Sequence, residues 1–374
     1  MLAKEIIKQI VFLIPFIRNF YIKKRVANGS IIPLEKLEDT LYKADKVVLK
    51  NNENPNICVG IVKDGYEYEG YVSNRAYYPK YEKFLKNNNI SYEYYDIYRH
   101  DWLEKAKKFD VIVWHTNSDP ATQDIATNKI YVLDKLMNKK CLPSFDEIWT
   151  YEDKVNAHYL YQHFNLPEIP TFVSHSKEDA LEYAEKAKYP IISKLNTGSA
   201  SFGVNKIANK RQAIKLINQA FSSKGAKTYF QFQRQKDYIL FQEFISDATY
   251  DLRIMVTGDK LFGYYRYPKK GDFKASGAGN VVKKAIEPKA LDLAFKVKEL
   301  FKANFLATDL LFSEKLNQYF IIESSIFIGI DTAEQLKINE VPGFYQRIKK
   351  GEYEFVEGKY WVQEFALKET IKNI

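Results

Sequence analysis

Short apolar runs alternate with segments of helical period between residues 57 and 138. Strand-like runs occur at residues 57–62, 91–97 and 109–114, and the apolar positions of residues 120–138 follow a helical period. Strands that alternate with helices are typical of a parallel sheet with right-handed crossovers. We therefore expect a small parallel α/β domain over residues 41–145.

After residue 145 the pattern predicts two further units. The first, at residues 146–227, has helical segments on either side of a strand that carries one lysine. The second, at residues 228–345, has a helix at residues 288–302 and strand patterns near Ile239, Arg253, Leu261, Val281, Asp309 and Glu323. Residues 1–40 form an N-terminal arm in this division, and residues 346–374 form a C-terminal tail.

Two strand patterns in the second unit each carry a lone carboxylate in an apolar setting. Asp309 lies in the first of them, and Glu323 lies in residues 319–325, about a hairpin later. A buried carboxylate is costly unless a cation or a hydrogen-bond network satisfies it. Two of them on adjacent strands suit a hard divalent ion such as Mg²⁺, so we expect a metal site here.

A lysine precedes a loop of small residues in the first unit. Lys194 ends an apolar strand, and Gly198, Ser199, Ser201 and Gly203 follow it. Backbone amides of such a loop can cradle phosphate oxygens, and a lysine alongside neutralises them. Together with the two carboxylates, this pattern predicts ATP as the ligand.

The order of these parts resembles the ATP-grasp superfamily, and within it amino-acid ligases such as ribosomal-protein glutamate ligases and D-alanine–D-alanine ligases. The resemblance covers residues 146–332 and includes the motifs at 153–154, 242–245, 251–253 and 271–280. It implies an α/β (α+β) chain with an ATP-grasp fold, preceded by the parallel α/β domain. It also implies that a carboxylate attacks the γ-phosphate of ATP and that an amine captures the resulting acyl phosphate.

The same resemblance assigns roles to individual positions. Nucleotide contacts fall to Lys154, Lys194, Gly198, Ser199, Ser201, Gly203, Gln242, Glu243, Phe244, Ile245 and Asp247, the last as an acid for the ribose hydroxyls. Charge stabilisation during catalysis falls to Arg253, Arg266 and Lys274, and binding of Mg²⁺ or Mn²⁺ falls to Asp309, Glu323 and Ser325. A structural ion pair with Asp251 is the alternative interpretation of Arg253.

Three positions depart from the family pattern. Ser201 stands where the family has a glycine, which restricts φ. Lys274 replaces an arginine, which keeps the charge but loses the bidentate fork. Ser325 replaces the asparagine of a Glu-x-Asn motif; a serine hydroxyl can bind Mg²⁺ but is shorter. The second metal position and full activity therefore stay open.

Three functions are consistent with these residues. The first is a carboxylate–amine ligase, the second is a kinase-like phosphoryl-transfer enzyme, and the third is a nucleotide-binding protein without catalysis, which Ser201 and Ser325 favour. For a ligase, we expect a small-molecule, saccharide or peptide carboxylate and an amine co-substrate. The basic N-terminal arm and a basic site rim, formed by Arg266, Lys269, Lys270 and Lys274, are similar to those of ATP-grasp proteins of bacterial surface-polysaccharide assembly.

Composition and charge indicate the class of protein, its cellular compartment and the partners to expect. The chain is 46% hydrophobic and 28% charged, as in an ordinary folded protein. Cys58 and Cys141 are far apart and match no spacing motif, which favours a reducing, cytoplasmic compartment. The net charge of +9 comes without a nucleic-acid motif, so we do not expect a nucleic-acid partner. The sequence leaves the oligomeric state open.

The arm at residues 1–25 has an apolar run flanked by cations. This run is too short to span a bilayer, which needs about 20 residues. A helix docked on the protein itself, a helix in contact with the inner face of the membrane, and a signal or anchor are the three interpretations.

Overall fold

The computed structural model of the chain describes residues 20, 22–26, 31–49, 56–64, 67–68, 70–198, 203–228, 230, 232–275, 277, 279–372 and 374. Most of the expected N-terminal arm therefore lies outside the described residues, and so do Ser199 and Ser201 of the expected phosphate loop. None of the helices in the described part of the chain is both long and apolar enough to cross a membrane.

The first domain is built on a four-stranded parallel sheet, which confirms the prediction. Its strands lie in the order β5 (Ser91–Tyr94), β2 (Cys58–Val62), β6 (Val111–Trp114) and β7 (Lys140–Leu142), and every neighbouring pair is parallel. β2 and β6 are buried along almost their whole length, which explains their continuous apolar sequences. β7 was not predicted, because it is too short to show a pattern.

The long helix of this domain begins at a clear start signal. α6 (Pro120–Tyr131) has a proline in its first turn, and the carboxylate of its N-cap residue Asp119 accepts the amide of Thr122 at 3.0 Å. A π-helical turn, Val132–Leu136, continues α6, so most of the predicted helix is present. The domain also contains α3 (Leu34–Tyr42), α4 (Tyr78–Asn87), α5 (Trp102–Ala106) and a small antiparallel sheet of β1 (Ile31–Pro33), β4 (Tyr71–Ser73) and β3 (Glu67–Tyr68).

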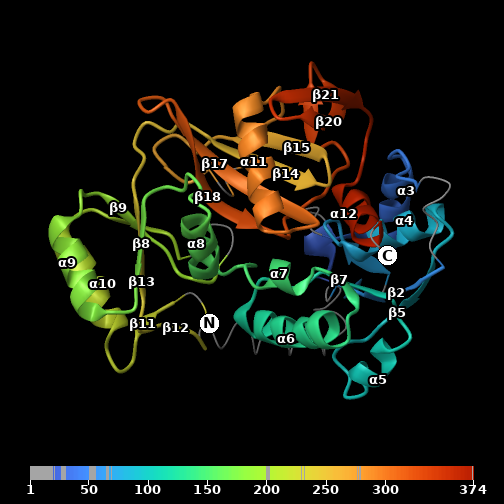
Figure 1. Ribbon diagram of the computed structural model, residues 1–374, viewed down its shortest axis with the longest axis horizontal. Coiled ribbons are helices and arrows are strands. Elements are labelled where there is room, and N and C mark those ends of the chain that lie inside the picture. The colour runs from blue at the N-terminus through green and yellow to red at the C-terminus, as the bar shows by residue number, and fades with distance from the viewer. Residues whose placement is uncertain are drawn as a thin grey trace.

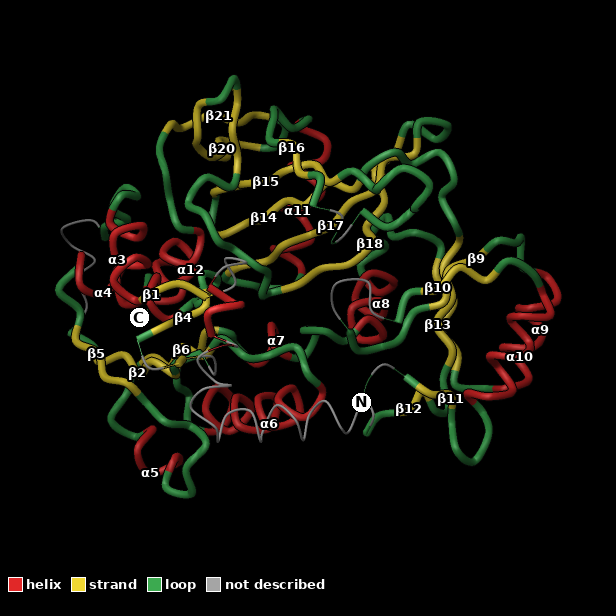
Figure 2. The backbone as a smooth tube through the Cα atoms, turned by 180° about the vertical axis from the view of Figure 1, so that it is seen from behind, coloured by secondary structure: helices red, strands yellow, loops and turns green. Residues whose placement is uncertain are grey.

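The first lobe is an antiparallel sheet covered by two helices. Its strands lie in the order β10 (Asn205–Ile207), β9 (Ile191–Ser193), β13 (Ile239–Glu243) and β8 (Thr171–Ser174). α9 (Lys177–Lys186) and α10 (Lys210–Ala220) lie side by side against this sheet, at one end of the molecule (Figures 1 and 2). Fully buried alanines such as Ala184 and Ala213 let them approach closely, and this core is separate from the rest.

One strand belongs to a different unit from the one we expected. β13 pairs with β8 and β9, so it is part of the first lobe, whereas the sequence division began the second lobe at residue 228. A short hairpin of β11 (Ala226–Lys227) and β12 (Arg234–Gln235) precedes it. The boundary between the lobes therefore follows β13.

The second lobe is an eight-stranded sheet. Its main path runs β18 (Gln318–Ser325), β17 (Phe305–Ser313), β14 (Asp251–Thr257), β15 (Lys260–Arg266), β20 (Val341–Lys349) and β19 (Leu336–Ile338), while β16 (Val281–Val282) pairs with β15 and β21 (Glu352–Glu357) pairs with β20. α11 (Pro288–Leu300) lies across one face of this sheet (Figure 1). α7 (Phe145–Ile148) and α8 (Lys154–His163) connect the first domain to the lobes.

The C-terminal segment is an integral part of the fold. β20 passes through residue 345, where we expected the second lobe to end. The last helix, α12 (Val362–Ile371), packs against α4 of the first domain (Figure 1). There Lys83 Nζ lies 2.5 Å from Glu364 Oε1, and both side chains are buried. This contact joins the first domain and the second lobe, which share one hydrophobic core.

Candidate active site

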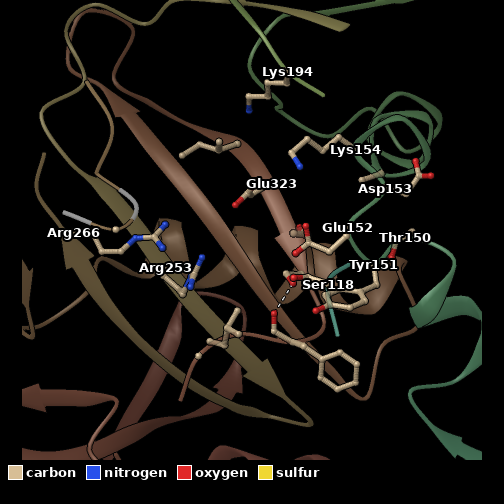
Figure 3. Close-up of a pocket in the computed structure, with 18 of the residues that line it drawn as sticks. Ser118, Thr150, Tyr151, Glu152, Asp153, Lys154, Lys194, Arg253, Arg266 and Glu323 are labelled. Atoms are coloured by element: carbon tan, nitrogen blue, oxygen red, sulfur yellow. Dashed lines mark hydrogen bonds between the residues drawn. The ribbon is translucent and has the colours of Figure 1, made fainter. Parts of the chain in front are cut away.

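A cavity of about 710 Å³ is lined by residues of the first domain and both lobes. Lys154, Lys194, Arg253, Arg266 and Glu323 all line it, and Figure 3 shows their charged groups around the same space. The structure therefore brings together the two expected nucleotide lysines, two of the three expected catalytic cations and, with Ser325, two of the three expected metal ligands.

Lys154 is positioned by the start of α8. Asp153 is the N-cap residue, and its carboxylate accepts the amide of Asn156 at 2.8 Å, as the Asp-Lys motif predicts. The Lys154 ammonium extends to the first-lobe loop, where it donates to the carbonyl of Gly198 at 2.6 Å. The expected phosphate loop and the expected lysine are thus in contact.

Lys194 follows β9 and is buried. Its amide donates to the carbonyl of Leu240 at 3.1 Å, which continues the pairing of β9 with β13. Burial lowers the pKa of Lys194 to about 8, against the opposing effect of the Glu323 carboxylate. An anion in the cavity would favour the protonated form of this amine.

Arg253 and Asp309 are opposite each other on β14 and β17. Arg253 Nε donates to Asp309 Oδ1 and Nη2 donates to Oδ2, both at 2.7 Å. Arg266 Nη2 donates to the same Oδ2 at 2.6 Å, and Arg266 Nε donates to Asp251 Oδ1. The alternative pairing of Arg253 with Asp251 is therefore wrong, because the strand register gives Asp251 to Arg266.

This network sets the charge of both aspartates. Burial alone raises the pKa of Asp309, but the charges of Arg253 and Arg266 outweigh it and hold the pKa well below its usual range. Burial raises the pKa of Asp251 to about 6, although Arg266 opposes this shift. Asp309 is thus a fixed anion, and it does not itself line the cavity.

Glu323 is opposite Asp309 on β18 and lines the cavity, as does Ser325. The hydroxyl of Ser325 donates to the carbonyl of Phe327 at 2.7 Å. No cluster of three or more His, Cys, Asp or Glu side chains that could hold a metal exists in the described part of the chain. The residues fit an ion that is held mainly by a ligand's phosphates, with Glu323 as the protein carboxylate, because Mg²⁺ usually keeps waters and few protein ligands.

The predicted hinge contributes one side chain to the cavity. Gln242 lines it, and its Nε2 donates to Thr171 Oγ1 at 2.9 Å. Glu243, Phe244 and Ile245 follow but do not line the cavity. Asp247 is also outside it: its carboxylate accepts Ser313 Oγ at 2.8 Å and the amide of Lys315 at 3.0 Å. Asp247 therefore fixes the β17–β18 turn in the structure, and its contact with a ribose stays a prediction.

Lys274 and Gly203 both belong to the surroundings of the loop that follows β9. Lys274 Nζ donates to the carbonyl of Val204 at 2.8 Å, so it ties the second lobe to the first and does not line the cavity. Gly203 has φ +75°, and a Cβ there would lie 2.5 Å from the Leu195 side chain. This position requires glycine on both counts.

Several cavity residues were not predicted. Glu152 has a positive φ of 54°, and burial raises its pKa to about 6, against the effect of Lys154. His115 follows β6, and its partner Asp64 follows β2. The positions of His115 and Asp64 just after two predicted strands could have indicated this site, because ligands of parallel sheets bind beyond the carboxyl ends of adjacent strands.

No protein-family model matches the chain. The α-aminoadipate–LysW ligase LysX of Saccharolobus solfataricus is 26% identical over 245 residues, which cover 64% of this chain and 84% of that protein. The α-aminoadipate–LysW ligase LysX of Sulfurisphaera tokodaii is 25% identical over 238 residues, which cover 62% of this chain and 77% of that protein.

Solved structures resemble the fold at low sequence identity. Carboxyaminoimidazole ribonucleotide synthase from Aspergillus clavatus, complexed with ATP, gives a TM-score of 0.50 at 14% identity and covers 78% of this chain and 81% of its own. A RiPP-associated ATP-grasp ligase from Chryseobacterium gregarium was solved in complex with ADP and a leader and core peptide. It gives a TM-score of 0.50 at 12% identity and covers 72% of this chain and 89% of its own. The chain therefore has the ATP-grasp fold, and its sequence is similar to those of two α-aminoadipate–LysW ligases.

Proposed function

We propose that the protein is an ATP- and Mg²⁺-dependent ligase that joins a carboxylate to an amine through an acyl phosphate. The observation that carries this proposal is the convergence of Lys154, Lys194, Arg253 and Arg266 with Glu323 on one cavity of an ATP-grasp fold. Such a set of cations suits phosphoryl transfer, in which the protein mainly positions the reactants and neutralises charge.

The two lysines are suited to the phosphates of ATP. Lys154 already contacts the loop at Gly198, where backbone amides could donate hydrogen bonds to phosphate oxygens. Lys194 is buried, so its ammonium interacts with an anion through little intervening water. Glu323 would help to hold the Mg²⁺ that accompanies ATP, and this ion would supply further charge neutralisation. Asp309 could join it only if a guanidinium moved aside.

The two arginines are suited to the reacting centre. Asp309 uses only part of the hydrogen-bonding capacity of Arg253 and Arg266, and both line the cavity. Their remaining N–H groups can stabilise the transferred phosphoryl group, or the oxyanion that forms when the amine attacks. The buried aspartates hold them in place beforehand, so little reorganisation is needed.

We propose an amino acid or a peptide as the source of the carboxylate and the amine. The two curated relatives are named for α-aminoadipate and LysW, and one structural neighbour was solved with peptides. None of these relatives supports the surface-polysaccharide role that the basic arm suggested.

Two observations favour a nucleotide-binding protein without turnover. Asp309 is already neutralised by two arginines, and Ser325 replaces the longer asparagine of the family motif. Product analysis with ATP, Mg²⁺ and a panel of amino acids and short peptides separates the candidates. We expect ADP, phosphate and an amide. ADP with a phosphorylated acceptor would indicate a kinase-like enzyme, and unchanged ATP would indicate binding alone.

A further inference from the structure

The first domain forms one wall of the cavity. This wall contains a histidine that is held by a buried carboxylate. His115 Nδ1 lies 2.9 Å from Asp64 Oδ2, and Asp64 is only 8% exposed. The same carboxylate accepts the amide of Tyr77 at 2.8 Å and that of Tyr78 at 3.3 Å. Asp64 is therefore fixed by the backbone at the start of α4, and it fixes the imidazole in turn.

Aromatic rings hold the imidazole from two further directions. The ring of Tyr77 stacks on His115 with centroids 4.0 Å apart and planes 10° apart. Phe327 meets it edge-on at 4.7 Å. The Tyr77 hydroxyl donates to the Ile328 carbonyl at 2.7 Å and accepts the Ile328 amide at 3.0 Å, which locks the first domain to the chain after β18.

The second ring nitrogen remains available to a ligand. His115 lines the cavity and its side chain is 22% exposed. Among the described residues, Nε2 has no hydrogen-bond partner, while Nδ1 is committed to Asp64. An imidazole whose Nδ1–H is held by a carboxylate presents Nε2 as a proton acceptor.

We infer that His115, oriented by Asp64, accepts the proton that the amine substrate must lose before it attacks the acyl phosphate. The inference rests on the proposed ligase function. An alkylammonium ion has no lone pair, so one proton passes to Nε2. The free amine then attacks the carbonyl carbon and the C–N bond forms. The C–O bond to phosphate breaks, and the second proton of the nitrogen leaves with the phosphate.

The distribution of charge places the amine at this wall of the cavity. Figure 3 shows Tyr151, Glu152 and Ser118 across the cavity from Lys194. Tyr151 and Phe327 are in contact at 5.1 Å, and aromatic rings with a carboxylate favour a cation. Lys194 is across the cavity, so an ammonium group entering near Tyr151 and Glu152 is away from that lysine.

The test compares two nucleophiles that differ in their need for a base. Hydroxylamine is neutral at neutral pH, whereas the amino group of α-aminoadipate is protonated. A panel of N-acetylated amino acids supplies the carboxylate, and the one that gives most ADP with the wild-type protein is used. We expect His115→Asn to form hydroxamate at the wild-type rate and to lose amide formation with α-aminoadipate by about a hundredfold or more. Asn keeps a donor toward Asp64, so the fold is preserved.

A pH series and a matched variant complete the experiment. Raising the pH should restore amide formation by His115→Asn, because solvent then provides the free amine. Other groups near the imidazole also titrate: Asp64 and Tyr77 contact it, and Arg75, Asp119, Glu152 and Arg253 line the same cavity. The rescue by pH is therefore measured relative to His100→Asn, which changes an exposed histidine outside the cavity.

The outcomes separate the two claims. Equal loss of hydroxamate and amide in His115→Asn, or no loss of either, overturns the role of His115 while leaving the ligase intact. A wild-type protein that forms no hydroxamate with any carboxylate contradicts the ligase function and this inference with it. Selective loss of amide, rescued by pH, supports both.

Discussion

Arg253 on β14 and Asp309 on β17 face each other in strand register, with two N–H···O bonds of 2.7 Å between them. Arg266 binds the same carboxylate at 2.6 Å. The guanidinium groups are therefore oriented toward the cavity before any ligand binds. Donors held in place in this way stabilise developing charge without reorganisation, which is the largest contribution in many enzymes.

Replacing Arg253 by lysine should lower kcat by about a hundredfold or more, because the charge remains but the fork that binds Asp309 is lost. ATP affinity should change far less. Steady-state kinetics and isothermal titration on the same preparation measure the two effects. Arg211→Lys, on the exposed surface of α10, is the control. A variant with wild-type kcat would remove Arg253 from the catalytic machinery.

Replacing Lys194 by methionine should weaken MgATP binding roughly ten- to hundredfold, since a hydrogen bond to a charged group contributes about 1.5–3 kcal/mol. Lys188→Met removes an exposed lysine from the same lobe and should bind ATP normally. Isothermal titration of both variants gives the comparison. Equal affinities would show that the nucleotide binds elsewhere.

Glu323→Gln should abolish ATP turnover while the fold persists, because the change is nearly isosteric and removes only the anionic ligand. Ser325→Asn restores the family's motif and should keep or raise the affinity for Mg²⁺ in the presence of ATP. Turnover across a Mg²⁺ titration reports both. Wild-type turnover by Glu323→Gln would exclude this metal site, and loss of nucleotide binding in Ser325→Asn would show that serine fits a differently shaped site.

The pair Lys83–Glu364 should matter for stability and not for nucleotide binding. Removing one partner, as in Lys83→Met, leaves a buried charge and should cost about 3–5 kcal/mol of unfolding free energy. The double variant Lys83→Met with Glu364→Leu should recover much of this loss, because well-packed apolar residues often replace buried ion pairs without cost. Denaturant unfolding of the three proteins tests this; an additive double variant would contradict it.

The same glutamate predicts how stability depends on pH. Burial raises the pKa of Glu364 to about 7 in the folded protein, although Lys83 opposes the shift. The folded state therefore holds this proton more tightly than the unfolded state, and stability should fall as the pH rises from about 4.5 to about 7. Glu364→Gln should reduce this slope. An unchanged slope would show that other groups cause it.

Local patterns predicted most of the site. Lys194, Arg253 and Glu323 stand out because charged residues are rare in apolar strands, and the structure places all three on one cavity. Lys154 was assigned from the resemblance of Asp153-Lys154 to the family motif, which places it at the start of a helix, and α8 begins there. These signals are contained in a few consecutive residues.

Contacts between distant segments were not predictable in the same way. Asp247 was assigned to the ribose from the resemblance; its bonds to Ser313 and Lys315 were not predicted, because only the folded hairpin brings these residues near. His115 and Asp64 meet because β6 and β2 are neighbours in the sheet, and strand order is not contained in either segment. β13 was assigned to the wrong lobe for the same reason, since pairing and not composition decides which sheet a strand joins.

Oxygen transfer tests the central claim most directly. In the proposed reaction, one carboxylate oxygen attacks the γ-phosphorus of ATP and remains with the phosphate when the amine takes its place. With a carboxylate substrate labelled with ¹⁸O, the protein should release phosphate that carries one ¹⁸O atom together with an amide that keeps the other. Mass spectrometry of both products gives the answer. Unlabelled phosphate, or ATP that stays intact with every carboxylate and amine supplied, would contradict the account.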